Sequence, residues 1–186
     1  MTRRMLRALP ALLLSLCLAC GSTSEDPPTP GGEHCARFAF TLSDDSTASH
    51  VSSCSSTACG NGENPPNSGP HCNTWLSCRG YTTEQPRCAW LHNLEHGHAV
   101  FLYNCPEEGG CPDEVAKLEA VRAQATPTSN GIPRALVAPD AQLPKRFAAL
   151  LWRRTYLMDT VDPEALECLL ALQDKDAPEP NLGCLP

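Results

Sequence analysis

Beyond its first twenty residues, this 186-residue chain has no apolar run long enough to cross a bilayer, since a spanning helix needs about 20 such residues. It also has no serine-nucleophile elbow, no phosphate-binding loop and no dinucleotide fingerprint. No motif therefore points to a serine hydrolase or to a nucleotide-binding enzyme. The chain shows no internal repeat, and its length fits one domain with some chain to spare.

Positive charge is also scarce, and part of it lies in a segment that we expect to be removed. Arg3, Arg4 and Arg7 precede a short apolar run at residues 8–19, which is the pattern of a signal peptide and not of a membrane anchor. Loss of residues 1–19 takes three of the 14 basic residues and leaves 11 against 21 acidic ones, a net charge of −10. Such an acidic surface argues against nucleic acid and anionic lipid as partners.

The predicted signal peptide ends at residues 17–22, Cys-Leu-Ala-Cys-Gly-Ser. A small residue before a cysteine that is followed by Gly-Ser resembles a bacterial lipobox with Cys20 as the acylated lipid anchor, although Cys17 stands where an aliphatic residue is usual. We therefore expect an extracytoplasmic protein of the cell envelope that contacts the membrane by its lipid anchor only. Plain secretion is the alternative. The polar, proline-rich residues 20–33 are predicted to be a disordered tether.

Cysteine usage supports the same compartment. Ten of the twelve cysteines follow Cys20, and an even, high count in an exported chain is typical of a disulfide framework. The sequence does not determine the pairing. A cysteine-ligated zinc site is the alternative, but the absence of a Cys-x-x-Cys pair beyond the signal region argues against it. Loop composition favours three local bridges: Cys54–Cys59, Cys105–Cys111 and Cys168–Cys184.

Hydrophobic patterning and turn residues predict an α+β fold, a small mixed sheet with two or more helices, in a single disulfide-stabilised domain over residues 34–186. Residues 43–64 and 72–89 are predicted to be loops. Strands are expected at residues 36–42, 98–103, 134–138 and 146–158, the last with a helix as the alternative, and helices at residues 112–125 and 163–173.

The most distinctive stretch, residues 64–103, contains four of the six histidines: His71, His92, His96 and His98. A stiff proline turn, Pro-Pro-Asn-Ser-Gly-Pro at residues 65–70, holds His71 with little conformational entropy left to lose. His92 and His96 share one face of a helix, and they also share one face of a strand. Two imidazoles on one rigid element lose little entropy when they bind one metal ion, so the pattern favours joint ligation.

Residues 92–96 also spell His-x-x-Glu-His, the pattern of the inverzincin peptidases, in which a long helix positions the glutamate as general base. Here Gly97 and a strand-like run follow at once, so a long helix has no room and a peptidase is disfavoured. The competing interpretation is a hydrogen-bonded scaffold in which Glu95 is a salt-bridge or capping partner. For His50 and His98, each taken alone, a structural role is favoured.

These residues resemble a bacterial family catalogued as domain of unknown function 3105. The resemblance rests on the proline turn that ends in His71, on Gly80-Tyr81 and on residues 92–97, and it extends through residues 177–180, Ala-Pro-Glu-Pro. It covers roughly residues 48–181, and it implies one shared fold and one shared site, but no reaction. An upstream histidine of the family corresponds to His50. The family usually has an aromatic residue at position 98, which argues against His98 as a shared ligand, and most of the cysteines are additional.

The sequence thus predicts a site for a transition metal, copper or zinc, formed by His71, His92 and His96. His50 is a candidate fourth ligand. Glu95 is expected to lie next to the imidazoles and to support them without being one of the metal's own ligands. The alternative is a non-catalytic binding or structural module of the cell envelope, whose histidines are only hydrogen-bonded scaffold. The sequence identifies no protein or small-molecule partner.

Overall fold

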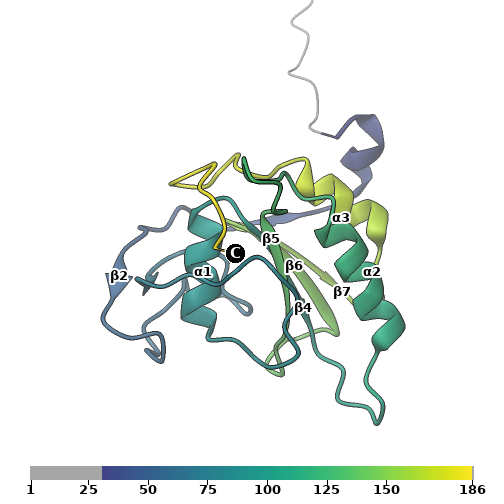
Figure 1. Cartoon of the computed structure of the whole chain (residues 1–186), viewed down its shortest axis with the longest axis horizontal. Helices are drawn as coiled ribbons and strands as arrows, with labels where there is room; N and C mark the ends of the chain where they lie inside the picture. The colour runs from purple at the N-terminus through teal and green to yellow at the C-terminus, as the bar shows by residue number, and fades with distance from the viewer. Residues whose placement is uncertain (1–30, 186) are drawn as a thin grey trace, which may run out of the picture.

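The computed structural model describes residues 31–185 (Figure 1). The predicted signal peptide, the anchor residue Cys20 and most of the predicted tether lie outside the described residues. In chain order, the helices are η1 (Glu33–Arg37, a 3-10 helix), α1 (Arg87–Glu95), α2 (Pro112–Arg122) and α3 (Pro163–Leu170). The strands are β1 (Thr41–Leu42), β2 (His50–Val51), β3 (His71–Cys72), β4 (Ala99–Tyr103), β5 (Ala135–Pro139), β6 (Phe147–Leu151) and β7 (Arg154–Met158).

The centre of the fold is a five-stranded mixed sheet in the order β1-β7-β6-β4-β5. β4 and β5 run parallel, and the other neighbouring pairs are antiparallel. A parallel pair needs a crossover connection, and α2 lies in the connection between β4 and β5. β2 and β3 form a separate parallel pair in which His50 lies opposite His71. The predicted α+β class with a mixed sheet is therefore confirmed.

The sheet separates two layers of helices (Figure 1). Side chains alternate along β4, so that Phe101 packs with Leu118 of α2 and Leu166 of α3, whereas Leu102 packs with Trp90 of α1. Burial of β4 on both faces explains its unbroken apolar sequence. α1 thus covers one face and α2 and α3 cover the other, while the two-stranded sheet packs against α1.

The helices form for two different reasons. α2 and α3 each begin with a proline, and Asp162 caps α3 by accepting a 3.2 Å hydrogen bond from the Ala165 N–H. No side chain caps the start of α1, and each of its residues from Cys88 to Glu95 is buried. Its stability therefore comes from packing on all sides and not from an amphipathic pattern.

The structure corrects several local predictions. The expected strand at residues 36–42 shrinks to Thr41–Leu42, because η1 takes up residues 33–37. The expected loops contain β2, the second residue of β3 and the start of α1. The single strand expected at residues 146–158 is a hairpin, β6 and β7, with Arg153 in the turn at a positive φ of 64°.

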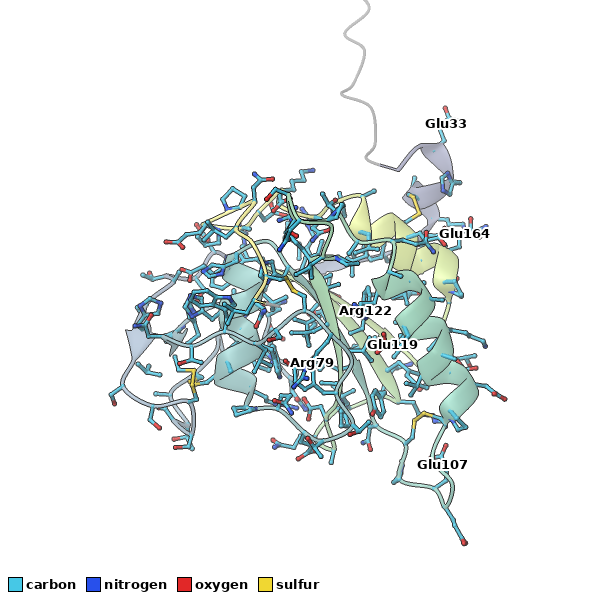
Figure 2. All side chains as sticks on the ribbon, in the orientation of Figure 1. Glu33, Arg79, Glu107, Glu119, Arg122 and Glu164 are labelled. Carbon is cyan, nitrogen blue, oxygen red and sulfur yellow. A yellow bond between two sulfur atoms is a disulfide. The ribbon has the colours of Figure 1, made fainter. Side chains whose placement is uncertain are left out.

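All ten cysteines of the described residues form disulfides (yellow bonds in Figure 2). The predicted bridge Cys105–Cys111 is confirmed, whereas Cys54–Cys59 and Cys168–Cys184 are wrong. Most true partners lie far apart in sequence, by up to 133 residues, and loop composition cannot reveal such pairs. The remaining bridges are Cys35–Cys168, Cys54–Cys72, Cys59–Cys88 and Cys78–Cys184.

Acidic side chains such as Glu33, Glu107 and Glu164 project from the surface (Figure 2). Within residues 31–185, none of the helices combines the length and the apolar composition that crossing a membrane would require.

Candidate metal centre

β2 and β3 place two histidines side by side. The His50 and His71 ring centroids are 5.1 Å apart, and the His71 N–H donates to the Ser49 carbonyl at 2.9 Å. The proline turn before His71 is fixed by the buried Asn67, whose amide donates to Thr155 Oγ1 of β7 at 3.0 Å. The turn thus anchors His71 to the main sheet.

α1 brings three polar side chains into the interior on the same side of the sheet. His92, Asn93 and Glu95 are at most 6% exposed, and burial of such groups is unfavourable unless they have partners. The Asn93 amide exchanges two 2.8 Å hydrogen bonds with the backbone of Leu76. His92 and Glu95, three residues apart on the helix, both reach towards His71.

Four donor groups converge between β2, β3 and α1. His50, His71, His92 and Glu95 each offer a ligand atom, and these atoms lie within 4.8 Å of one another. The three imidazole centroids form a nearly equilateral triangle with sides of 5.1, 5.0 and 4.8 Å. Glu95 Oε2 lies 2.9 Å from His71 Nε2 and 3.5 Å from His92 Nε2. Two ligands of a tetrahedral zinc ion lie about 3.3 Å apart, so these two distances bracket the separation that a shared metal requires.

Backbone carbonyls fix the orientation of two of these rings. His71 Nδ1 lies 2.9 Å from the Gly69 carbonyl, and His92 Nδ1 lies 2.9 Å from the Cys72 carbonyl. Since a carbonyl can only accept, each Nδ1 is protonated and donates, which leaves Nε2 directed at Glu95. This is how metal-binding histidines are commonly held. Gly69 has a φ of 98°, and a Cβ there would approach the Gly60 backbone carbonyl carbon to 2.7 Å, so the turn requires glycine.

The charges at this centre depend on the pair formed by His71 and Glu95. Burial opposes ionisation of Glu95, but the hydrogen bond and the charge of His71, together with nearby His92 and His96, outweigh it and lower the Glu95 pKa. Burial also opposes protonation of His71, but the hydrogen bonds to Glu95 and to the Gly69 carbonyl outweigh it and raise the His71 pKa. Without metal, a proton on His71 Nε2 therefore occupies the position that a metal would take.

His92 is electrostatically different. Burial, followed by the neighbouring charge of His71, lowers the pKa of His92 below 6.5. The His92 ring is therefore neutral at pH 7, and its Nε2 lone pair is available to a metal.

His96 belongs to an adjoining group of donors. It is the C-cap residue of α1, and its ring centroid is 4.4 Å from that of His92. Its donor atom, however, groups with those of Glu95 and Glu179, and His96 Nε2 lies 3.6 Å from Glu179 Oε2. Burial, followed by the charges of His92 and His98, lowers the pKa of His96 to about 4.

An open pocket of about 380 Å³ lies over these residues. His50, His92, His96, Trp75 and Glu179 all line it. His50 and His92 of the converging group therefore face the same opening as His96, whereas His71 is fully buried behind them.

His98 lies behind the site, and both of its ring nitrogens are engaged. Asn93 Nδ2 donates to His98 Nδ1 at 3.0 Å, and His98 Nε2 donates to the Leu182 carbonyl at 2.9 Å. Burial lowers the pKa of His98 to about 4, so the ring is neutral and serves as a hydrogen-bonded link between α1 and the C-terminal tail.

One comparison with known proteins gives a match. The family model described as protein of unknown function (DUF3105) matches residues 50–185. The chain belongs to this family. The match starts at His50 and includes every residue of both donor groups. No curated protein and no solved structure matches the chain.

The structure brings most of the predicted site residues together, but it divides them differently. His71 and His92 converge with His50 and Glu95, and the structure places the Glu95 carboxylate among the imidazoles instead of behind them. His96 is a neighbour of this group and not a member of it. Sequence reasoning missed Glu179 as a site residue. The only signal for it was that residues 177–180, Ala-Pro-Glu-Pro, belong to the stretch that resembles the family.

Proposed function

We propose that this family member is an exported, lipid-anchored protein that binds a transition metal, copper or zinc, through His50, His71 and His92, with Glu95 as the fourth donor. One observation carries the proposal: the Nδ1 atoms of His71 and His92 are fixed by carbonyl oxygens, and both Nε2 atoms face one carboxylate. Imidazole donors suit copper and zinc, and a bound ion would offset the unfavourable burial of Glu95.

The disulfides support the export part of the proposal. Structural disulfides form and persist in oxidising compartments, and all ten cysteines of the described residues are paired. The N-terminal sequence pattern that ends at Cys20 supplies the proposed route and anchor. Replacing Cys20 by Ser and following membrane association in a bacterial host tests this part, because the variant should lose the membrane fraction.

The alternative function is a non-catalytic envelope module in which the histidines are scaffold only. It is favoured by the hydrogen bond between His71 and Glu95, which satisfies both groups without a metal. It gives no reason for His50, which is exposed, and whose side chain makes no hydrogen bond within residues 31–185.

Metal binding by the untagged protein decides between the two functions. After treatment with a chelator, the protein is titrated with Zn²⁺ or Cu²⁺ by calorimetry, and the bound metal is quantified by mass spectrometry. We expect at least one equivalent, and a rise in unfolding free energy of about 2.7 kcal/mol at a free metal concentration a hundredfold above Kd.

His50→Ala is the decisive variant, because the exposed ring can be removed with little effect on folding. We expect at least a tenfold loss of affinity. His34→Ala is the matched control: this histidine is also exposed but lies in η1, outside the converging group. A parent protein that holds no stoichiometric metal, or a His50→Ala protein with unchanged affinity, would refute the proposal.

A further inference from the structure

The group formed by Glu95, His96 and Glu179 adjoins the site described above and shares one of its residues. The three donor atoms of this group lie within 4.8 Å of one another. Glu95 also belongs to the group formed with His50, His71 and His92. A carboxylate has two oxygens and can therefore contact two cations at once.

The C-terminal tail is held so that Glu179 reaches this position. The Glu179 N–H donates to the Glu95 carbonyl at 3.0 Å, directly joining the tail to the end of α1. On the N-terminal side of Glu179, Asp174 forms a bidentate ion pair with Arg134. On its C-terminal side, the disulfide Cys78–Cys184 ties down the end of the tail.

A second set of contacts supports the same placement. Arg154 pairs with Asp176 at 2.6 Å, and the Leu182 carbonyl accepts the hydrogen bond from His98. Glu179 thus lies in a segment that is fastened on both sides, and it does not depend on a freely moving chain end.

His96 has an unexplained environment for a buried imidazole. Its side chain is 4% exposed, yet Nδ1 has no hydrogen-bond partner among the described residues. Nε2 lies 3.6 Å from Glu179 Oε2, which is too long for a good hydrogen bond but close to the separation of about 3.3 Å between two ligands of one tetrahedral ion. His96 therefore lacks a good hydrogen bond at either ring nitrogen, and an ion at Nε2 would supply the missing partner on the side of Glu179.

The two carboxylates beside His96 also favour the binding of a cation. Glu95 and Glu179 present two carboxylates within 4.8 Å of each other, and like charges at this distance repel. Within residues 31–185, neither carboxylate forms an ion pair with a lysine or arginine. The protonated His71 offsets the charge of Glu95, but Glu179 has no charged cationic partner among the described residues.

We propose that Glu95 bridges two divalent metal ions, the first held by His50, His71 and His92 and the second by His96 and Glu179. This inference rests on the proposed function, because it places the second ion beside the first. Carboxylate-bridged pairs of this kind have metal separations of about 3.5–4 Å. With one imidazole and two carboxylates, the second position suits zinc or a harder divalent ion better than copper(I).

The second ion is expected to bind more weakly than the first. It has fewer protein donors, and the Glu179 side chain is 57% exposed. Donors of both positions line the same open pocket of about 380 Å³, so water or a small ligand can complete the coordination of both ions from one side.

Stoichiometry measured with Zn²⁺ alone tests the bridge. Chelator-treated protein is titrated by calorimetry, and the metal retained is quantified by mass spectrometry. We expect two equivalents with separate affinities for the parent protein. Glu179→Gln, at an exposed position, should weaken the second equivalent at least tenfold and leave the first unchanged. His96→Asn should behave in the same way, which gives a second variant should either one fold poorly.

Glu63→Gln is the matched control, because Glu63 is exposed and belongs to neither donor group. It should retain both equivalents. In crystals soaked in Zn²⁺, anomalous scattering should show two peaks about 3.5–4 Å apart on either side of Glu95.

The outcomes separate the two proposals. One equivalent in the parent protein, unchanged in Glu179→Gln, would overturn the bridge and leave the proposed function intact. Two equivalents that both survive in Glu179→Gln and His96→Asn would also overturn it, because the second ion would then lie elsewhere. No bound zinc or copper in the parent would refute the proposed function and the bridge together.

Discussion

Replacing Glu95 by Gln tests the electrostatic core of the site without any metal. The change keeps the size of the side chain but removes the charge that holds the proton on His71 Nε2, at 2.9 Å. Both side chains are buried, with exposures of 8% for Glu95 and 0% for His71. A hydrogen bond to a charged group contributes about 1.5–3 kcal/mol, and we expect Glu95→Gln to lower the unfolding free energy by that amount in the presence of a chelator.

The loss should depend on pH in a defined way. The pKa of Glu95 is lowered from 4.5, so its stabilising effect is present above that value and is lost as the pH falls through the lowered pKa. The pKa of His71 is raised from 6.5, so its effect is fully present below 6.5 and is lost as the pH rises through the raised pKa. The cost of Glu95→Gln should therefore be greatest between about pH 5 and 6.5 and should decrease on both sides.

Urea denaturation of parent and variant at several pH values, all with chelator, measures this cost. Glu179→Gln serves as the control. The Glu179 side chain is 57% exposed, and the histidine that lies 3.6 Å from it, His96, is neutral. A cost that does not vary with pH, or one no larger than that of Glu179→Gln, would refute the assignment of a charged pair to His71 and Glu95.

Two further predictions concern the scaffold. Burial lowers the pKa of His98 from 6.5 to about 4. As the pH falls, His98 therefore takes up a proton in the unfolded state before it does so in the folded state. The unfolding free energy should fall by up to about 3 kcal/mol between pH 6.5 and 4. His98→Gln should lose this part of the pH dependence in urea titrations at pH 7 and 4.5, and an unchanged slope would contradict it. Removing the disulfide Cys35–Cys168 should lower the unfolding free energy by about 4 kcal/mol by the chain-entropy relation, because the bridges Cys54–Cys72 and Cys78–Cys184 shorten the loop that it closes. Removing Cys105–Cys111, with a separation of 6 residues, should lower it by about 2 kcal/mol. Calorimetry of the two Cys→Ser pairs would contradict this order if the costs were equal.

The elements that the sequence predicted well are those with local signals. Pro163 after the cap residue Asp162 marked the start of α3, and the apolar run at residues 98–103 marked β4. α1 was missed before residue 92, because its sequence has no cap and no apolar stripe. Burial on all sides stabilises this helix, and that environment is a property of the assembled fold.

The site shows the same division between local and long-range information. The proline turn and the short spacing of His92 and Glu95 made both motifs visible in the sequence. Their division into two adjoining donor groups was not visible, because it depends on where Glu179 of the C-terminal tail and His50 of β2 lie in space. Neither residue has a local pattern that indicates its distance from His92.

The composition of α1 bears on the choice between a scaffold and a binding site. Trp90, Leu91 and Leu94 of the same helix are at most 1% exposed, so this environment accepts apolar side chains readily. Replacing a buried ion pair by apolar residues of similar volume is often neutral or stabilising, and a purely structural role therefore gives no reason to keep Glu95 and its partner His71 in the interior. A ligand that needs imidazole and carboxylate donors does give one. The exposed His50 places a third imidazole beside that of His92, which is the arrangement that such a ligand would use.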